Sequence, residues 1–485
     1  MTHGLSKSKI LSGIQCRKRL WLEVYRPDMA ESDQGLQAIL DTGRKVGEIA
    51  RDYLAPGGVC VDLEQDLGNA LEMTRKHLDT SPAPLYEATF THDQVLIRSD
   101  IVSRSNSGLH VTEVKSSTRV KEYHLWDCAV QLWVLRGAGY PVQQMQVAII
   151  DSSFVYPGDG DYHGLLRVED VTRDVLELQP QAEEWISRCK RVLHESIPDI
   201  EIGNHCGSPF DCPFQGYCNP GDGPEYPLEC LPRISSELHQ ELSSEGYQDI
   251  RDIPQGRLKK ENQERVRRVT VSGQSEVLPE IAEILGNQPY PRYFLDFETI
   301  QFAVPIWEGT RPYQQLPFQW SCHVEQEPGM ISHLEFLDLS GHPPMRGFAE
   351  SLISACGETG PIFVYASFEA RIIRELIQQH PDLTGSLEVI LERIVDLLPI
   401  VRQHYYHPQM YGSWSLKAVL PCLAPELDYS SLDEVQDGHK AQEAYSEAIA
   451  HETTSQRCEE IRQELLAYCK MDTLALVRIV EVLSG

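Results

Sequence analysis

Length, composition and charge narrow the class of protein before any motif is considered. The chain has 485 residues, of which 41% are hydrophobic, and a formal net charge of −29. These values predict two to four domains with substantial cores and exclude a disordered or fibrous chain. No apolar run reaches the ~18–20 residues that cross a bilayer, and the N-terminus lacks an apolar leader segment. We therefore expect a cytoplasmic protein with no membrane partner.

The strong negative charge excludes a general nucleic-acid coat protein, although a local basic track is sufficient for contacts with phosphates. Two such tracks are present, and each is explained equally well as a solvated helix face. They comprise Lys7, Lys9, Arg17, Lys18, Arg19 and Arg26, and Arg257, Lys259, Lys260, Arg265, Arg267 and Arg268. The chain also has 13 cysteines, which in a cytosolic protein indicate metal ligands or buried thiols rather than disulfides.

The first half of the chain alternates between helical and strand patterns, which predicts an α/β domain. In chain order, the predicted elements are a helical start at 5–26, an amphipathic helix at 34–54, a strand at 85–90, a hairpin at 95–115, a helix at 122–138, a strand at 142–150 and a helix at 181–194. Pro180 stands just before the last of these helices as a start signal. Glu87 is expected on one face of the first strand.

Two acidic residues and a lysine come together in the predicted hairpin. Asn106–Gly108 is typical of a turn, and the residues after it alternate as in a strand. We expect Asp100 to end the first strand, and Glu113 and Lys115 to share one face of the second. Carboxylates suit Mg²⁺ or Mn²⁺, and a lysine suits the orientation or deprotonation of a water molecule. A solvated charged hairpin is the alternative interpretation.

Three cysteines recur in a loop rich in glycine and proline. Five residues separate Cys206 from Cys212, and five separate Cys212 from Cys218. Loop cysteines can turn several sulfurs toward one centre, so we expect metal binding rather than buried structural thiols. Thiolates suit zinc as well as iron, and His205 can replace one of the sulfurs.

The order of these motifs resembles the iron–sulfur RecB-type PD-(D/E)XK nucleases of CRISPR adaptation and of helicase–nuclease repair complexes. The shared features are Cys16-Arg-Lys-Arg-Leu-Trp21, Asp100, Glu113-Val-Lys115, Gln131 on the next helix, and the three late cysteines. The resemblance implies a restriction-endonuclease-like fold in which Asp100 and Glu113 bind the metal and Lys115 is catalytic. Gln131 would position Lys115 or DNA.

The same resemblance implies a [4Fe–4S] cluster that staples the two ends of the domain. Its ligands would be Cys16, Cys206, Cys212 and Cys218, with zinc as the alternative metal. We expect single-stranded DNA or another nucleic acid as substrate, held through its backbone and stacked on aromatics such as Trp21, Tyr123 and Trp126, and a helicase or a defence-system protein as partner.

One departure from this family concerns its early helix, where many relatives have a metal-binding histidine after Gly-x-x-Val. Here Gly43-Arg-Lys-Val46 is followed by Gly47 and Glu48, so that either Glu48 contributes through a water molecule or the site has fewer ligands. We group Glu48 with Arg19, Glu87 and Lys417 as candidate nucleic-acid-binding residues.

Residues 219–290 predict a linker followed by a helical spacer. The segment 219–227 is dense in glycine and proline. The segments 234–242 and 246–253 favour a pair of helices that faintly resembles a helix–hairpin–helix module, although the glycine signature is incomplete and a plain spacer is the simpler interpretation.

The second half opens with a strand at 292–299 that carries Asp296 and Glu298 two residues apart and hence on one face. A helix at 463–483 places Tyr468 and Asp472 one turn apart. Paired acids at a strand can share two divalent ions, whereas the alternative is an ordinary polar strand edge. Together these motifs resemble the DEDD exonucleases. That resemblance implies an RNase H-like fold, with Asp296, Glu298 and Asp472 binding two metals and Tyr468 holding the attacking water.

Three further segments lie between these motifs. A strand at 361–368 precedes a helix at 369–379 and delivers Glu369, where relatives usually have Asp. Asp396 ends another apolar run and is also expected near the metals. The turn at 411–417 ends in Lys417 and suits a phosphate, although a helix cap at Ser413 or Ser415 explains its serines equally well. Gly438–Ala441 is expected in a polar loop, where a surface role for His439 is favoured.

We therefore expect an α/β protein with a nuclease domain at 1–218, a spacer at 219–290 and an exonuclease-like domain at 291–485. The leading hypothesis is a nuclease with two sites that depend on Mg²⁺ or Mn²⁺. Because the early histidine is missing and Glu369 replaces Asp, a nucleic-acid-binding scaffold with a degenerate site is the second hypothesis. A redox sensor in which the cluster gates binding is the third.

Overall fold

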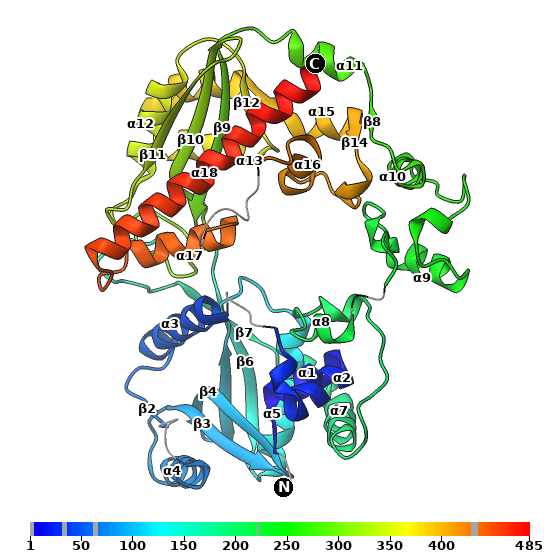
Figure 1. Cartoon of the computed structure of the whole chain (residues 1–485). Helices are drawn as coiled ribbons and strands as arrows, with labels where there is room; N and C mark the ends of the chain where they lie inside the picture. Colours follow the sequence, from blue (N-terminus) through cyan, green and yellow to red (C-terminus); the bar gives the residue numbers. More distant parts are fainter. Residues whose placement is uncertain (1–3, 32–35, 62–65, 220, 222, 428–434) are drawn as a thin grey trace. The chain divides into compact units, whose positions relative to one another are not determined.

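The structure, a computed structural model, describes residues 4–31, 36–61, 66–219, 221, 223–427 and 435–485. The chain forms two compact units (Figure 1). The first comprises Met1–Asp222 and Phe302–Gln314, and the second comprises Gly223–Gln301 and Gln315–Gly485. One mixed sheet has seven strands and the other has five, which confirms the predicted α/β class. Across the described ranges, no helix is long and apolar enough to cross a bilayer.

The first unit contains a mixed sheet with helices packed against it. Its helices are α1 (Lys7–Gln15), α2 (Arg17–Tyr25), α3 (Leu36–Leu54), α4 (Leu67–Thr80), α5 (Glu122–Gly137), α6 (Thr172–Glu177), α7 (Gln179–Val192) and α8 (Gln215–Cys218), with 3-10 turns η1 (Pro27–Met29) and η2 (Asn204–Cys206). Its strands are β1 (Leu5–Ser6), β2 (Val59–Cys60), β3 (Leu85–His92), β4 (Val95–Ser105), β5 (Gly108–Val114), β6 (Val142–Ile150) and β7 (Leu166–Asp170).

The strand order is β2-β3-β4-β5-β6-β7, with β1 beside β4. Strands β3, β4 and β5 form an antiparallel meander, and β5 and β6 are parallel, which requires the crossover that α5 supplies. Leu109 and Val111 alternate onto the core face of β5, and Glu113 follows them on the same face. The sheet therefore presents this carboxylate to the helical layer.

Most predicted elements of this unit form, with three differences. The hairpin is confirmed by the pairing of Ser105 with Gly108. However, Asp100 does not end its strand, because Ile101 and Val102 continue the ladder as buried β-branched residues. The helical start is broken at Cys16, whose backbone is extended. Pro180 lies in the first turn of α7 rather than before it. Gln34 of the predicted amphipathic helix lies outside the described residues.

The second unit has a five-stranded sheet, a small two-stranded sheet and many helices. Its helices are α9 (Ser236–Ser244), α10 (Glu261–Ser272), α11 (Glu280–Gly286), α12 (Met345–Cys356), α13 (Phe368–Gln379), α14 (Thr384–Glu392), α15 (Leu397–His404), α16 (Leu416–Leu423), α17 (Gly438–Ala448) and α18 (Ser455–Ser484), with 3-10 turns η3 (Leu228–Cys230), η4 (Ile250–Asp252), η5 (Pro381–Leu383) and η6 (Pro408–Met410). Its strands are β8 (Glu276–Val277), β9 (Arg292–Ile300), β10 (Leu316–Glu327), β11 (Met330–Leu337), β12 (Ile362–Val364), β13 (Ile394–Asp396) and β14 (Tyr405–Tyr406).

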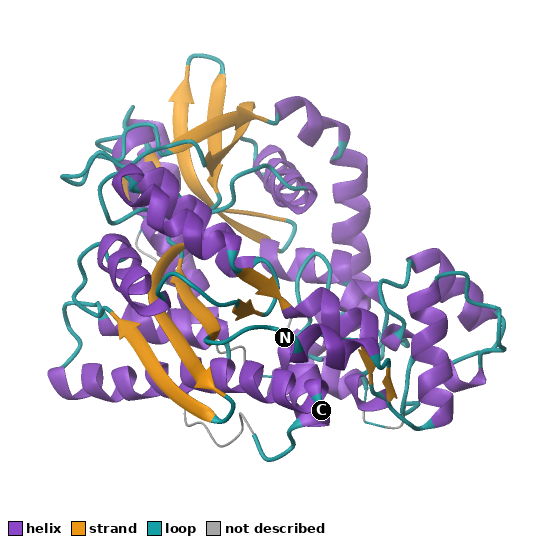
Figure 2. Ribbon diagram, turned by 90° about the horizontal axis from the view of Figure 1, so that it is seen from above, coloured by secondary structure: helices purple, strands orange, loops and turns teal. Residues whose placement is uncertain are grey.

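The larger sheet has the order β11-β10-β9-β12-β13. Strands β9, β10 and β11 are antiparallel neighbours, whereas β12 runs parallel to both β9 and β13. The long helix α18, red in Figure 1, crosses β9 and β10. Figure 2 shows helices alongside the strands of both large sheets. Because α18 covers the central strands, its inward residues face the acids of β9.

Two sequence predictions fail in this unit. The segment 246–253 forms the short turn η4 rather than a helix, because Asp249 caps Arg251 and Gly246 has a positive φ of 93°. Gly438–Ala441 is helical rather than a polar loop, because the Asp437 side chain accepts the Lys440 N–H and starts α17. Residues 220 and 222 of the predicted linker lie outside the described residues.

Candidate active sites

The first candidate site is a network of two acids and two lysines. The Lys115 Nζ donates to Glu113 Oε1 and to Asp127 Oδ2, each at 2.7 Å. The Lys7 Nζ from α1 lies 2.6 Å from Glu113 Oε1 and 3.4 Å from Asp127 Oδ1. Both acids are buried. Burial disfavours the charged form of Asp127, but the charges of Lys115 and Lys7 outweigh it and lower the pKa of this carboxyl.

Gln131 holds the two acids in place from α5. Its Nε2 donates to Glu113 Oε2 at 2.7 Å and to Asp127 Oδ1 at 3.0 Å, and its Oε1 accepts from Ser99 at 2.8 Å. Asp127 and Gln131 are four residues apart on a helix and hence neighbours on one face. A fully buried amide with this many partners fixes the orientation of both carboxylates.

Asp100 lies beside this network on β4. Its Oδ2 accepts the Val114 N–H at 2.6 Å. Burial and the neighbouring charge of Glu113 raise the pKa of Asp100 to about 7. The structure therefore brings Asp100, Glu113, Lys115 and Gln131 close to one another.

Two members of this cluster were not predicted from the sequence. Lys7 was assigned only to a basic track, and Asp127 lies in the predicted helix at 122–138 without a role assigned to it. The spacing of four residues between Asp127 and Gln131 was the signal available for the acid. For Lys7 no local signal exists, because its contact with Glu113 spans 106 positions of the chain.

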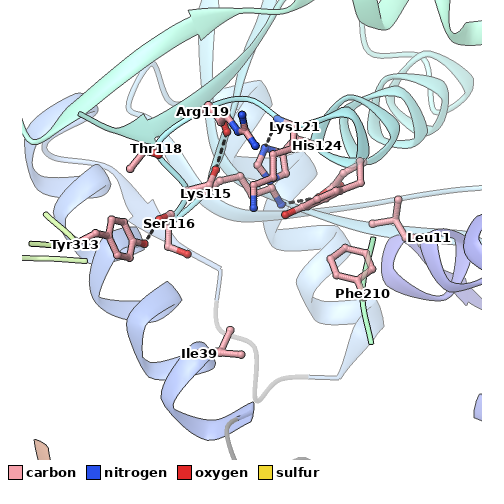
Figure 3. A pocket seen from close by; sticks show the side chains of 13 residues that line it. Leu11, Ile39, Lys115, Ser116, Thr118, Arg119, Lys121, His124, Phe210 and Tyr313 are labelled. Carbon is pink, nitrogen blue, oxygen red and sulfur yellow. Dashed lines mark hydrogen bonds and ion pairs between the residues drawn. The ribbon is translucent and has the colours of Figure 1, made fainter. Parts of the chain in front are cut away.

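A cavity of about 630 Å³ opens beside Lys115 (Figure 3). Its lining residues are Leu11, Ile39, Lys115, Ser116, Ser117, Thr118, Arg119, Lys121, Tyr123, His124, Asp127, Phe210 and Tyr313. The Tyr313 hydroxyl donates to the Ser116 carbonyl. Burial and nearby Lys115 lower the pKa of His124 to about 4, so its ring is neutral at pH 7. The single carboxylate of this lining, Asp127, is already paired with lysine.

Aromatic side chains at the cavity differ from those that we expected to stack on nucleic acid. Tyr123 lines the cavity and lies 4.8 Å from the Phe210 ring, measured between centroids. Trp126 instead packs on Trp185 at 6.0 Å, and Trp21 packs on Tyr25. The phenyl and phenol rings at the cavity are therefore those of Tyr123, which was expected, and of Phe210 and Tyr313, which were not.

The remaining candidates of the first unit lie apart from the network. Glu87 pairs with Arg51 at 2.6 Å. Glu48 is exposed on α3. Arg19 donates to Glu23 at 2.9 Å and to the Gln15 side chain at 2.9 Å. None of these contacts within the described residues places Arg19, Glu48 or Glu87 against Lys115.

The N-terminal helices are hydrogen-bonded to the cysteine loop. Gln15 Nε2 donates to the carbonyls of His205 and Phe210, both at 2.6 Å. Cys16 follows directly, so these bonds bring it toward the late cysteines. Burial raises the pKa of the Cys212 thiol, and the charges of Cys16 and Cys206 raise it further.

The cysteine sulfurs nevertheless do not converge on one point. Throughout the described ranges, the one set of three or more potential ligand atoms within 4.8 Å of one another belongs to acidic residues of the second unit. A tetrahedral zinc site with Zn–S bonds of ~2.3 Å needs sulfurs about 3.8 Å apart. Within the described residues, no three of the sulfurs of Cys16, Cys206, Cys212 and Cys218 therefore approach one another as closely as a single zinc ion requires.

That acidic set is the second candidate site. Asp296 and Glu298 from β9 and Asp472 from α18 each bring one carboxylate oxygen within 4.8 Å of the others. Burial and the charge of Asp472 raise the pKa of both Asp296 and Glu298 well above the ordinary value. The Cys469 thiol lies 3.5 Å from Asp296 Oδ2 and donates to it. Three buried acids that repel one another form a site for divalent cations.

Glu369 extends this set from the start of α13. It is 2% exposed, and its Oε2 has no hydrogen-bond partner within the described residues. Burial, together with the charges of Asp396 and Asp472, raises the pKa of Glu369 to about 8. Asp396 has a different role, because its Oδ1 accepts the N–H groups of Ala366 and Leu398, each at 2.9 Å. An orphaned buried carboxylate oxygen is the kind of atom that a cation would satisfy.

Tyr468 and Lys417 lie next to each other at this site. The Lys417 Nζ is 5.8 Å from the centroid of the Tyr468 ring and donates to the Gln436 carbonyl at 2.6 Å. The charge of Lys417 also acts on Glu298. At the turn before α16, the Ser415 side chain makes no cap hydrogen bond. All the sequence candidates of this half thus surround one acidic centre, with Asp396 at its edge.

The mid-chain basic track is largely neutralised. Arg257 pairs with Glu241 and Glu245, Arg267 pairs with Glu264, and Arg265 and Arg268 both pair with Glu276. These four arginines therefore do not form a continuous positive stripe.

Fold and geometry define the chain as an α/β protein with two mixed sheets and a buried acidic triad. Residues 293–415 match a family described as "Domain of unknown function (DUF2779)". The matched segment includes Asp296, Glu298, Glu369 and Asp396 and ends before Asp472. No curated protein sequence matches the chain.

Proposed function

We propose that the protein is a metal-dependent nuclease that hydrolyses phosphodiester bonds of nucleic acid, with single-stranded DNA as the preferred substrate. The observation that carries this proposal is the buried triad Asp296, Glu298 and Asp472, together with the unpartnered Glu369 Oε2. Four carboxylates in an uncharged interior are costly unless cations accompany them. We infer that Mg²⁺ or Mn²⁺ accompanies them in the working protein.

Sheet topology supports an RNase H-like assignment for the second unit. Its strand order is β11-β10-β9-β12-β13, with β12 and β13 parallel to β9. If the five strands are numbered 1 to 5 along the chain, this is the order 3-2-1-4-5. The acidic side chains come from the central strand β9 and the last helix α18, which is the arrangement that the resemblance to DEDD exonucleases implies. Removal of nucleotides from a 3′ end is therefore the activity that we assign to this unit.

At the second site, bound divalent ions would supply a metal hydroxide and neutralise charge on the phosphate. Asp296, Glu298, Asp472 and Glu369 are the residues that would hold these ions. Tyr468 has a hydroxyl on the same helix as Asp472, which suits orientation of the attacking water. Lys417 adds a positive charge beside Glu298 for a substrate phosphate.

The topology of the first unit supports a PD-(D/E)XK assignment. An antiparallel meander β3-β4-β5, the crossover helix α5 and a parallel β6 carry Asp100, Glu113, Lys115 and Gln131. The adjoining cavity combines Arg119 and Lys121 with aromatic rings, a combination that suits a single strand held by its phosphates and stacked bases. We assign this cavity to nucleic acid.

The four cysteines remain our candidate ligands for a [4Fe–4S] cluster. This assignment rests on the resemblance to iron–sulfur nucleases and on the contacts of the N-terminal helices with the cysteine loop. Gln15 and Arg19 bind the cysteine loop from the N-terminal helices, so that a cluster on Cys16 and Cys212 would join the two ends of this unit.

To test the proposal, degradation of end-labelled single-stranded DNA would be followed with Mn²⁺ or Mg²⁺ for the wild type, Lys115→Ala and Asp296→Asn. Matched controls are Lys190→Ala, which removes a half-buried lysine of the first unit that pairs with Asp93, and Asp382→Asn, which alters an exposed acid of the second unit. We expect each site variant to lose at least about 100-fold in the rate of its own reaction. Undiminished degradation by the double variant Lys115→Ala/Asp296→Asn would refute the proposal.

A second function is favoured by one observation. The ammonium group of Lys7 contacts both Glu113 and Asp127, so the first site is already neutralised without a cation. The first unit would then bind nucleic acid without cutting it. Unaltered activity of Lys115→Ala, combined with loss of all activity in Asp296→Asn, would favour this arrangement.

A further inference from the structure

Two adjoining cavities flank the N-terminus of α10 in the second unit. Their volumes are about 890 Å³ and 620 Å³. They share Glu261, Asn262 and Arg402 as lining residues. We call the pair the α10 groove.

The α10 groove is rich in cations although the chain is strongly acidic. The basic residues of its lining are Arg233, Lys259, Lys260, Arg265, Arg268 and Arg402. Glu276 forms ion pairs with two of these arginines, and Glu264 is paired with an arginine outside the groove. Among the described residues, Glu261 is therefore the acid of the lining that makes no ion pair.

Three of the cations are available to a ligand. In the part of the chain that the structure describes, Lys259 makes no ion pair but donates to the Gly256 carbonyl at 3.4 Å, whereas Arg233, Lys260 and Arg402 make neither an ion pair nor a side-chain hydrogen bond. A concave surface with three such cations and one acid attracts anions. The α10 groove therefore differs from the neutralised basic track around it.

Arg265 gives an independent indication of a missing acceptor. Its side chain is nine-tenths buried, and it lines the larger cavity. The Nη1 donates to the carbonyls of Arg402 and Gln403 at 2.6 Å and 3.1 Å. The Nη2 has no acceptor within the described residues. A buried guanidinium donor without a partner is expensive, and an anionic oxygen would complete its set.

Two segments connect the α10 groove with the acidic triad. Asp396, whose charge acts on Glu369, caps the N-terminus of α15, and Arg402 lies about 9 Å further along the axis of this helix. The loop that supplies Gly412 and Trp414 to the groove continues to Lys417, whose charge acts on Glu298. Each of these two segments thus carries a residue of the α10 groove and a charged residue that acts on the acids of the second site.

We propose that the α10 groove binds the phosphodiester backbone of a single-stranded nucleic acid whose 3′ end lies at the acidic triad. This inference rests on the proposed exonuclease activity of the second unit, and it adds a binding site for the part of the strand upstream of the cut. Arg233, Lys260 and Arg402 contact phosphates without reading bases, so the site accepts any sequence.

The test measures salt dependence of binding to a fluorescent 20-nucleotide single strand by anisotropy, in EDTA to prevent hydrolysis. The full-length Arg233→Ala/Arg402→Ala variant is compared with the wild type and with Arg346→Ala, whose exposed arginine pairs with Glu350 and Asp382 elsewhere in this unit. Each lost phosphate contact lowers the slope of log K against log salt by ~0.7. We expect a decrease of about 1.4 for the double variant and none for the control.

Hydrolysis gives the second readout. With Mn²⁺, the double variant should show a raised KM for the 20-nucleotide strand and an unchanged KM for a dinucleotide, which is too short to reach the groove. A wild-type slope in the double variant, or an equal decrease in the control, would overturn the α10 groove as a backbone site. If the salt dependence of binding decreases in the double variant as expected but the wild type hydrolyses neither strand, the nuclease proposal alone would be refuted.

Discussion

Replacement of Asp472 by Asn should stabilise the metal-free protein, although it removes a residue of the candidate active site. The oxygens of Asp296, Glu298 and Asp472 lie within 4.8 Å. Two full charges at that separation repel by about 3.5 kcal/mol when the effective dielectric constant is ~20. Because burial and the charge of Asp472 raise the pKa values of Asp296 and Glu298, protonation relieves part of this repulsion, and the relief decreases as the pH rises. We expect a gain of roughly 1–3 kcal/mol at pH 8.

The sign of the pH dependence follows from Glu369, whose pKa rises from 4.5 in the unfolded chain to about 8 in the fold. The folded protein then binds a proton more tightly than the unfolded chain. The contribution of Glu369 to the free energy of unfolding is therefore fully present below pH 4.5 and is lost as the pH rises through about 8. The metal-free wild type should therefore become less stable from pH 5 to pH 9, and Asp472→Asn should show a smaller loss.

The assay is calorimetric unfolding with EDTA and with Mn²⁺, with Asp382→Asn as the control for an exposed acid. Saturating Mn²⁺ at 100 times its Kd adds about 2.7 kcal/mol to a protein that binds it. We expect this increment in the wild type and in the control, and little of it in Asp472→Asn. A destabilised Asp472→Asn variant that still responds fully to Mn²⁺ would refute this reasoning.

Three further predictions concern other parts of the chain. Lys7→Ala leaves two buried acids with one cation, so it should destabilise the protein by about 2–4 kcal/mol in urea unfolding, whereas a Lys9→Ala control should change it by less than about 0.5 kcal/mol. Cys212→Ala should abolish absorbance near roughly 400 nm in anaerobically purified protein, while Cys230→Ala should retain it, and equal spectra would exclude Cys212 as a ligand. Burial lowers the pKa of His323 from 6.5 to about 4, so the contribution of this residue to folding stability is present above pH 6.5 and is lost as the pH falls toward 4. His323→Gln should therefore remove part of the decrease in melting temperature at acid pH, and an unchanged decrease would contradict this role.

Local sequence patterns predicted much of the two sheets. The turn Asn106–Gly108 and the alternation after it located the β4–β5 hairpin, because both signals act over a few residues. The spacing in Asp296-Phe-Glu298 likewise placed two carboxylates together on β9. Asp472 joined them from a distant helix, a pairing that depended on resemblance because no local rule connects the two segments.

Other features depend on tertiary contacts that a local pattern does not contain. Lys7 enters the first site because α1 packs against α5, which no spacing along the chain reveals. The segment 246–253 has helical periodicity, yet the side chain of Asp249 and the positive φ of Gly246 direct it into a turn. Glu369 and Asp396 were both expected at the metals, but backbone N–H groups engage Asp396 and leave Glu369 as the orphaned acid.

The central claim is that the buried acids of the second unit exist to hold divalent cations. Anomalous diffraction from crystals grown with Mn²⁺ tests it most directly. We expect an anomalous peak about 2.1 Å from carboxylate oxygens of Glu298 and Asp472, and its loss in Asp472→Asn. Ordered electron density for Asp296, Glu298 and Asp472 with no anomalous peak between them, at millimolar Mn²⁺ and neutral pH, would contradict the account.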